Sequence, residues 1–160
     1  MQYIKYNDLD KTQKKLVDES HKVLENAYSP YSKFCVGCSI LTKNDIIING
    51  TNIENSAYGS TLCAEKAAIS KANSEGLREF KKIAVTGKSL VIDVNEMVAP
   101  CGDCRQIIKE FSHISDTNIE IIMSDSKKEN IRISTIDELL PVAFGPKDIG
   151  IDLNEYKLNN

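Results

Sequence analysis

Three of the five cysteines stand in two short segments whose spacing suits a metal ion. Cys63 opens the sequence CAE, and Cys101 and Cys104 are three residues apart in PCGDC. Both segments are predicted to begin helices, where unpaired backbone N–H groups and the helix dipole lower the pKa of a thiol. Three convergent thiolates would bind zinc and leave its fourth position open, which is typical of a catalytic site.

A single glutamate accompanies these cysteines. Glu65 lies two positions after Cys63, which is too close for a comfortable further ligand, so its carboxylate is expected to handle the proton of a water on the metal. Three thiolates also bring excess negative charge to a divalent ion. Lys66 and Arg105 are the candidates to offset it, and Arg105 is favoured because its planar guanidinium can donate to more than one sulfur.

Two other interpretations of the cysteines remain open at this point. Cys35 and Cys38 form a second C-x-x-C, so a structural zinc site made of two such pairs is conceivable. However, Cys35 and Cys38 fall in an alternating strand pattern, where an odd offset points side chains to opposite faces, which favours buried strand residues. A redox pair at Cys101 and Cys104 would need an N-terminal βαβ pattern, which the sequence lacks.

The hydrophobic periodicity predicts an α/β fold in which a mixed sheet of about five strands is covered on both faces. Pro100 is expected to open the third long helix, and Thr61 to cap the second. The expected elements are a helix over 10–27, a hairpin over 34–48, a helix after 61, a strand over 82–86, a helix from 100, strands over 119–123 and 131–134, and a short helix over 135–140.

The composition bounds the class of partner. The chain has 160 residues with 20 Lys and Arg against 23 Asp and Glu, which gives a net charge of −3. This balance provides no excess of positive charge with which to bind the phosphates of a nucleic acid. The N-terminal segment has no signal-peptide pattern, no apolar run is long enough to span a membrane, and an odd number of cysteines indicates reduced thiols. We expect one cytoplasmic domain over residues 1–160, without a nucleic-acid or membrane partner.

The two cysteine segments together resemble the paired signature of the zinc-dependent cytidine deaminases of the small homotetrameric type. The similarity extends in the same order through YSPYSKFCVG from Tyr28, NIENSAYG from Asn52, and the LLP and FGP triplets over 139–146. This resemblance implies a three-layer α/β/α sandwich and one Zn²⁺ per subunit on Cys63, Cys101 and Cys104. It also implies hydrolysis of cytidine and deoxycytidine to uridine, deoxyuridine and ammonia in pyrimidine salvage, with Glu65 as the catalytic residue.

The resemblance further implies which residues contact a nucleoside. The expected set is Asn52 and Glu54 at the ribose, Phe34 and the backbone N–H of Ala64 at the pyrimidine, and Tyr58 and Phe144 reaching the active site of a neighbouring subunit. A carboxylate near the sugar would repel a phosphate, which favours a nucleoside over a nucleotide. Lys66 departs from the pattern, because many relatives have arginine after the glutamate.

Two alternative functions share some of these residues. An aminonucleoside-antibiotic deaminase of the same superfamily also carries the CAE and PCGxCRQ elements, although the FCVG run and the loop from Asn52 favour cytidine. The second alternative is a non-catalytic, zinc-stabilised interaction module. Such a module has no use for Glu65 beside an open metal position, so that residue separates the two classes.

Overall fold

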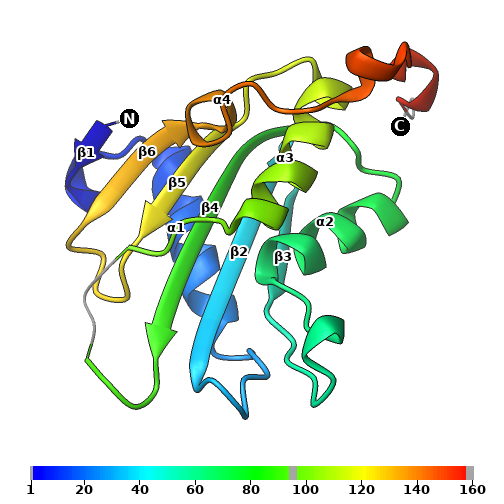
Figure 1. The fold of residues 1–160 in the computed structure, drawn as a ribbon. Coiled ribbons are helices and arrows are strands. Elements are labelled where there is room, and N and C mark those ends of the chain that lie inside the picture. The colour runs from blue at the N-terminus through cyan, green and yellow to red at the C-terminus, as the bar shows by residue number, and fades with distance from the viewer. Residues whose placement is uncertain (1, 94–96, 158–160) are drawn as a thin grey trace.

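The computed structural model describes residues 2–93 and 97–157, in which helices cover both faces of one mixed sheet (Figure 1). The strand order is β1-β6-β5-β4-β2-β3, with β4 and β5 parallel and the other neighbouring pairs antiparallel. The strands are Gln2–Ile4 (β1), Phe34–Thr42 (β2), Ile47–Thr51 (β3), Phe80–Ser89 (β4), Glu120–Ser124 (β5) and Ile131–Thr135 (β6). The three-layer sandwich is therefore confirmed, with six strands in the described residues where about five were expected.

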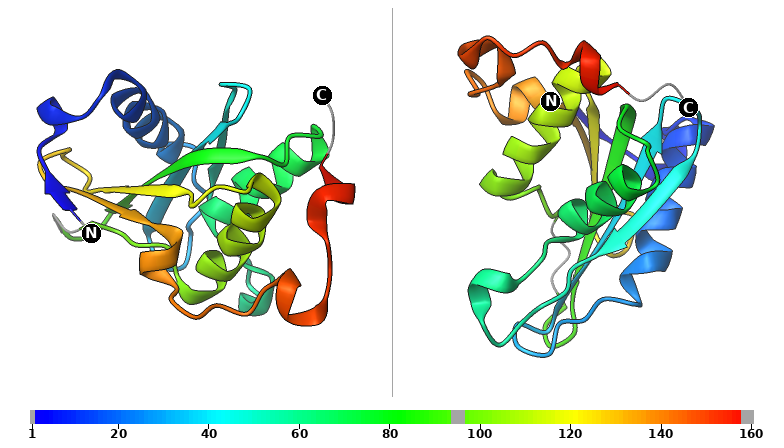
Figure 2. Two further views of the ribbon diagram at one scale, coloured as in Figure 1. Left: turned by 90° about the horizontal axis from the view of Figure 1, so that it is seen from above. Right: turned by 90° about the vertical axis from the view of Figure 1, so that its right-hand side faces the viewer.

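The helices divide between the two faces of the sheet. α1 packs against one face, while α2 and α3 lie next to each other on the opposite face (Figures 1 and 2). The α-helices are Lys11–Leu24 (α1), Ala64–Ser74 (α2), Gly102–Ser115 (α3) and Ile136–Leu139 (α4), and single turns of 3-10 helix cover Tyr6–Asp8, Tyr58–Ser60, Pro146–Ile149 and Leu153–Tyr156. None of the helices in the described ranges is long and apolar enough to cross a bilayer.

The additional strand is β1, at the edge of the sheet. It pairs antiparallel with β6, placing Gln2 opposite Ile133 and Ile4 opposite Ile131. Three residues are too few to show an alternating pattern, so periodicity does not predict this strand. The guanidinium of Arg132 lies 4.6 Å from the ring centroid of Tyr3, a cation–π contact that adds to the backbone pairing.

The first helix ends earlier than its periodicity predicts. α1 begins with a capping box between Asp10 and Gln13 and stops at Leu24, three residues before the expected Ala27. The backbone N–H of Tyr28 donates to the carbonyl of Asn52, so it is not available to continue the helix. The segment after α1 is thereby drawn alongside the segment that follows β3.

Apolar side chains from both helical layers bury the sheet. Leu16 and Val17 of α1 are fully buried against one face, and Ile69 of α2 and Ile108 of α3 are buried against the other. Burial on both faces explains why the KIAVT run of β4 is apolar without alternation. This packing fixes α2 and α3 on one face, where both present their N-terminal ends to the same region.

His21 of α1 links stability to pH. Its imidazole is half-buried with Nε2 3.2 Å from the Ser124 Oγ, and burial together with the nearby Lys128 charge lowers the pKa of His21 to about 4. The unfolded chain titrates near 6.5, so stability is full above that pH and falls as the pH drops from about 6.5 to about 4, by about 1–2 kcal/mol once solvent screening is allowed for. Denaturant unfolding of wild type and His21→Gln across this range measures the effect. An unchanged pH dependence in His21→Gln would contradict it.

Candidate active site

Both cysteine segments lie at helix starts, as predicted, although each helix begins later than expected. Cys63 is the N-cap of α2, and Cys101 is the N-cap of α3, where its sulfur accepts a hydrogen bond from the Cys104 N–H at 3.4 Å. The predictions that Thr61 caps α2 and that Pro100 opens α3 were wrong. Thr61 Oγ1 instead accepts a hydrogen bond from the Asn55 N–H at 3.2 Å, within the loop before the helix.

The two helix starts bring three sulfurs together. The Sγ atoms of Cys63, Cys101 and Cys104 all lie within 4.8 Å of one another, and the searched residues contain no other such group of His, Cys, Asp or Glu. Thiolates on one tetrahedral zinc stand about 3.8 Å apart, since each Zn–S bond is about 2.3 Å. The cluster is therefore close to the size of a metal site, and its soft donors suit zinc.

The sulfurs also interact with one another. The hydrogen bond from the Cys104 thiol lowers the pKa of Cys63 to about 6, and the same pairing, together with burial, raises the pKa of Cys104. Cys63 is half-buried, Cys101 exposed and Cys104 buried, so the cluster runs from the surface into the space between the two helices.

Cys35 and Cys38 stay outside this cluster. Both are buried in β2, where the Cys35 sulfur lies 3.1 Å from the Ser29 Oγ and Cys38 packs in the core beneath α2. They are buried strand residues, as the alternation predicted. A four-sulfur structural site made from the two C-x-x-C pairs is excluded by this arrangement.

Glu65 stands in the first turn of α2 with its side chain almost entirely buried. The residue is 4% exposed, and burial raises the pKa of its carboxyl, against hydrogen bonds from its own backbone N–H and from Cys104. The preceding Ala64 is fully buried at the first helical position, where a backbone N–H has no partner within the helix. The site thus contains a buried carboxyl with a raised pKa and a backbone donor close to the sulfurs in sequence.

Asn52 and Glu54 hold the start of β2. The Asn52 amide lies between the strand's backbone groups, accepting from the Val36 N–H at 2.8 Å and donating to the Phe34 carbonyl at 2.9 Å. The Glu54 carboxylate accepts from the N–H groups of Tyr31 at 2.8 Å and Ser32 at 3.2 Å. Hydrogen bonds from the Ser32 side chain and from these backbone groups lower the pKa of Glu54, which keeps it ionised.

Phe34, the first residue of β2, is half-buried over a glycine of β4. A Cβ added to Gly87 would stand 2.9 Å from the Phe34 Cε1 and 2.2 Å from the Val98 Cγ2. A larger residue at Gly87 would therefore push against the Val98 side chain and the Phe34 ring, so the glycine leaves the space that these two side chains occupy.

A known family matches this arrangement of residues. The cytidine and deoxycytidylate deaminase zinc-binding region matches residues 10–120, a span that includes all three clustered cysteines and Glu65. The chain belongs to this deaminase family. Its members are hydrolytic enzymes, and the family's zinc-binding region makes zinc the cofactor that corresponds to the cysteine cluster.

Individual deaminases are similar over most of their length. The chain is 45% identical to the cytidine deaminase of Sporosarcina psychrophila over 135 residues, covering 84% of this chain and 93% of that protein. It is 42% identical to the cytidine deaminase of Halalkalibacterium halodurans over 134 residues, covering 84% and 95%. The crystal structure of cytidine deaminase from Burkholderia pseudomallei superposes with a TM-score of 0.73 at 33% identity, covering 82% of this chain and 98% of that one.

Lys66 of this deaminase is paired with a carboxylate, so it is not a free counter-charge for the sulfurs. Its ammonium forms an ion pair with the Asp103 carboxylate, and this pairing raises the pKa of Lys66. The prediction treated Lys66 as a free counter-charge and missed Asp103 as its partner. The available signal was the pair of opposite charges in the first turns of the two ligand-bearing helices.

The Lys66–Asp103 pair gives a testable effect on metal retention. Lys66→Met leaves the Asp103 charge beside the ligands and is expected to speed zinc release about two- to five-fold, the range of an exposed ion pair. The double variant Lys66→Met with Asp103→Asn removes both charges and should return close to the wild-type rate. Transfer of zinc to a chromophoric chelator measures both rates. Release from the double variant as fast as from Lys66→Met would contradict this account.

Arg105 makes contacts that the sequence did not predict. Its Nε donates to the Pro100 carbonyl at 2.8 Å and its Nη1 donates to the Leu139 carbonyl at 3.0 Å. Within the described part of the chain, Arg105 makes no hydrogen bond to a sulfur, so the expected direct contact with the thiolates is wrong.

Tyr58 and Phe144 are exposed aromatic residues in this single chain. Tyr58 is 77% exposed and its ring makes an edge-to-face contact with that of Tyr31, with ring centroids 6.1 Å apart, while Phe144 is 61% exposed. The Phe144 backbone is held by α3, because the Gln106 Nε2 donates to its carbonyl at 3.0 Å. Both rings are available to contact another molecule.

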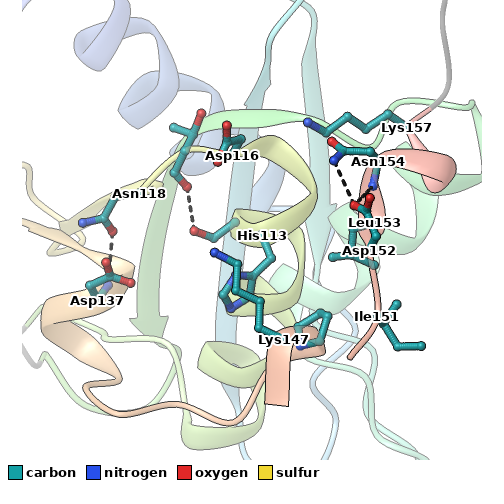
Figure 3. A pocket seen from close by; sticks show the side chains of 13 residues that line it. His113, Asp116, Asn118, Asp137, Lys147, Ile151, Asp152, Leu153, Asn154 and Lys157 are labelled. Atoms are coloured by element: carbon teal, nitrogen blue, oxygen red, sulfur yellow. Dashed lines mark hydrogen bonds between the residues drawn. The ribbon is translucent and has the colours of Figure 1, made fainter. Parts of the chain in front are cut away.

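A separate cavity of about 420 Å³ lies between the C-terminal end of α3 and the segment after Pro146 (Figure 3). His113, Asp116 and Lys147 are among its lining residues, and none of the predicted site residues lines it. The His113 Nε2 would stand 2.7 Å from a Cβ added to Gly145, so this ring packs against the C-terminal segment. The cavity is distinct from the cysteine cluster.

Proposed function

We propose that this chain catalyses the zinc-dependent hydrolytic deamination of cytidine and deoxycytidine to uridine, deoxyuridine and ammonia. The observation that carries the proposal is the cluster of Cys63, Cys101 and Cys104, with sulfurs within 4.8 Å of one another beside the buried Glu65. The cytidine deaminases at 42–45% identity support the substrate class. Residues 1–160 are proposed to form one catalytic domain.

The three cysteines would hold one zinc ion per chain. When bound, the ion supplies a Lewis acid that ionises water near neutral pH. The carboxylate of Glu65 takes one proton of the attacking water and delivers it to the pyrimidine ring. It then takes the remaining hydroxyl proton of that water from the adduct and passes it to the amine, which leaves as ammonia. Burial favours this role, because a carboxyl with a raised pKa exchanges protons more readily near neutral pH.

The residues around the cluster would hold the nucleoside. The Asn52 Nδ2 carries a second hydrogen beyond the one given to Phe34, and this hydrogen and the Glu54 carboxylate are proposed to bind ribose hydroxyls. The Phe34 ring packs on the pyrimidine, and the Ala64 N–H donates to a polar atom of the ring. The ionised Glu54 disfavours a phosphate group, so the proposed substrate is a nucleoside.

The proposed assembly is a homotetramer in which the exposed Tyr58 and Phe144 complete the active sites of neighbouring subunits. The proposed setting is cytoplasmic pyrimidine salvage, with no nucleic-acid or membrane partner. Size-exclusion chromatography with light scattering tests the assembly. A fully active monomer would remove the intersubunit roles of both aromatic residues.

A substrate panel tests the proposed function. Turnover of cytidine, deoxycytidine, cytidine monophosphate and an aminonucleoside antibiotic is followed by ultraviolet absorbance, with the zinc content measured on the same preparation. We expect both nucleosides to be deaminated and the monophosphate to be a poorer substrate. Preference for the antibiotic would contradict the assignment, and a full zinc content without any turnover would indicate an interaction module instead.

A further inference from the structure

Arg105 connects the metal-ligand segment to a part of the chain far away in sequence. Pro100 immediately precedes Cys101 and is buried, and its carbonyl accepts from the Arg105 Nε at 2.8 Å. The Leu139 carbonyl, at the last residue of α4, accepts from the Nη1 of the same guanidinium at 3.0 Å. One planar group therefore holds two backbone carbonyls that belong to different elements.

We propose that Arg105 is a positioning residue for the metal ligand Cys101. The guanidinium holds the Pro100 carbonyl close to the end of α4. It thereby fixes the position of the backbone at Cys101, and with it the position of the Cys101 sulfur. This inference rests on the proposed function only in that the cysteine cluster binds zinc. It replaces a role through charge on the thiolates with a role through geometry.

The geometry of the contacts distinguishes the two roles. A counter-charge needs only a cation near the sulfurs, and lysine would supply it as well as arginine does. Two carbonyls in fixed directions need the rigid fork of a guanidinium, which a lysine ammonium on a flexible stem does not reproduce. Cys101 is the exposed member of the cluster, so its position depends on its backbone more than on packing around its sulfur.

The adjacent contacts of α3 provide a control. The Lys109 Nζ lies 2.5 Å from the Asp137 carboxylate, which also joins α3 to α4 but touches neither Pro100 nor a ligand. Lys109→Met therefore removes a comparable link between the same two helices. Any effect confined to Arg105 variants arises from the contact with Pro100, and not from looser docking of α4.

The test measures zinc release, without substrate, from zinc-loaded wild type and the variants Arg105→Lys, Arg105→Met and Lys109→Met. Loss of groups that orient metal ligands typically weakens metal binding 10–100-fold, so both Arg105 variants are expected to release zinc about 10–100 times faster than wild type. Lys109→Met should release zinc within twofold of wild type. Thermal unfolding of the metal-free forms is recorded alongside, to compare the stability of the fold.

Two results would overturn the proposal. Zinc release from Arg105→Lys at the wild-type rate would show that charge, and not the fork, matters. Equally fast release from Lys109→Met would show a general effect of helix docking. Neither result depends on substrate, so a chain that fails to deaminate cytidine but shows the expected Arg105 dependence contradicts the proposed reaction alone.

Discussion

Replacing Glu65 with glutamine is expected to lower kcat for cytidine by about 10²–10⁴-fold, the usual contribution of a residue that transfers protons in the transition state. Glutamine has nearly the same shape but cannot accept a proton from water or return one to the leaving amine. Because Glu65 is not expected to hold the metal, zinc content should remain one per chain. Steady-state kinetics and metal analysis on the same sample measure both quantities.

The same chemical change elsewhere on the helix serves as the control for Glu65→Gln. Glu75 follows the last turn of α2 and is exposed, so Glu75→Gln alters a carboxylate without touching the site. It is expected to leave kcat unchanged. Wild-type turnover by Glu65→Gln with zinc bound would rule out the proposed proton transfers.

Replacing Cys104 with serine is expected to abolish zinc retention and to reduce turnover by at least about 10³-fold, since nothing else in the site would ionise water at neutral pH. Cys104 is buried, and its sulfur lies with those of Cys63 and Cys101. Serine occupies nearly the same volume as cysteine, but its hydroxyl is a poor ligand for zinc. Metal analysis after dialysis, followed by the cytidine assay with added zinc, measures the loss.

The same substitution at a buried cysteine outside the cluster is the control, because it removes a buried thiol without removing a metal ligand. Cys35→Ser makes the same change in β2, where the Ser29 Oγ already lies 3.1 Å from the sulfur and can partner a hydroxyl. This variant should keep its zinc and its turnover. If Cys35→Ser lost zinc as Cys104→Ser does, the assignment of three ligands would be wrong.

The helix starts that carry Cys63, Cys101 and Cys104 were predictable because they depend on local structure, whereas the convergence of the three sulfurs depends on the packing of α2 beside α3. Each segment combines a cysteine with residues that favour a helix start, and the unpaired backbone N–H groups at a helix start suit a thiolate ligand. Both predicted helix starts were displaced by two residues, because Thr61 and Pro100 are favourable residues at a helix start but the cysteines occupy the caps themselves. The identity of the ligands was not affected by that displacement.

The partner of Arg105 could not be found in the same way. Arg105 binds the backbone carbonyl of Leu139, and a carbonyl is present at every residue, so no side chain marks which one is used. Its proximity to a ligand in sequence suggested a contact with sulfur, but the tertiary packing of α4 against α3 provided a different acceptor. Lys66 differs, because its partner Asp103 was visible as an opposite charge.

The fold likewise contains elements that their own residues predict and elements that depend on contacts with residues far away in sequence. The long helices and the apolar strands were recognisable from their periods, whereas β1 has three residues and exists because β6 offers it an unpaired edge. The early end of α1 also depends on a distant group, the carbonyl of Asn52. Elements that are short, or whose ends are set by a neighbour, carry little signal in their own residues.

Zinc on the cysteine cluster is proposed to make this chain a cytidine deaminase, and one titration tests this most directly. Metal-free protein is loaded stepwise with zinc, and uridine formed from cytidine is measured at each step against the zinc bound. We predict no uridine without zinc and a linear rise that stops at one zinc per chain. Full binding of zinc without uridine, or uridine formed at a rate independent of zinc, would contradict the claim.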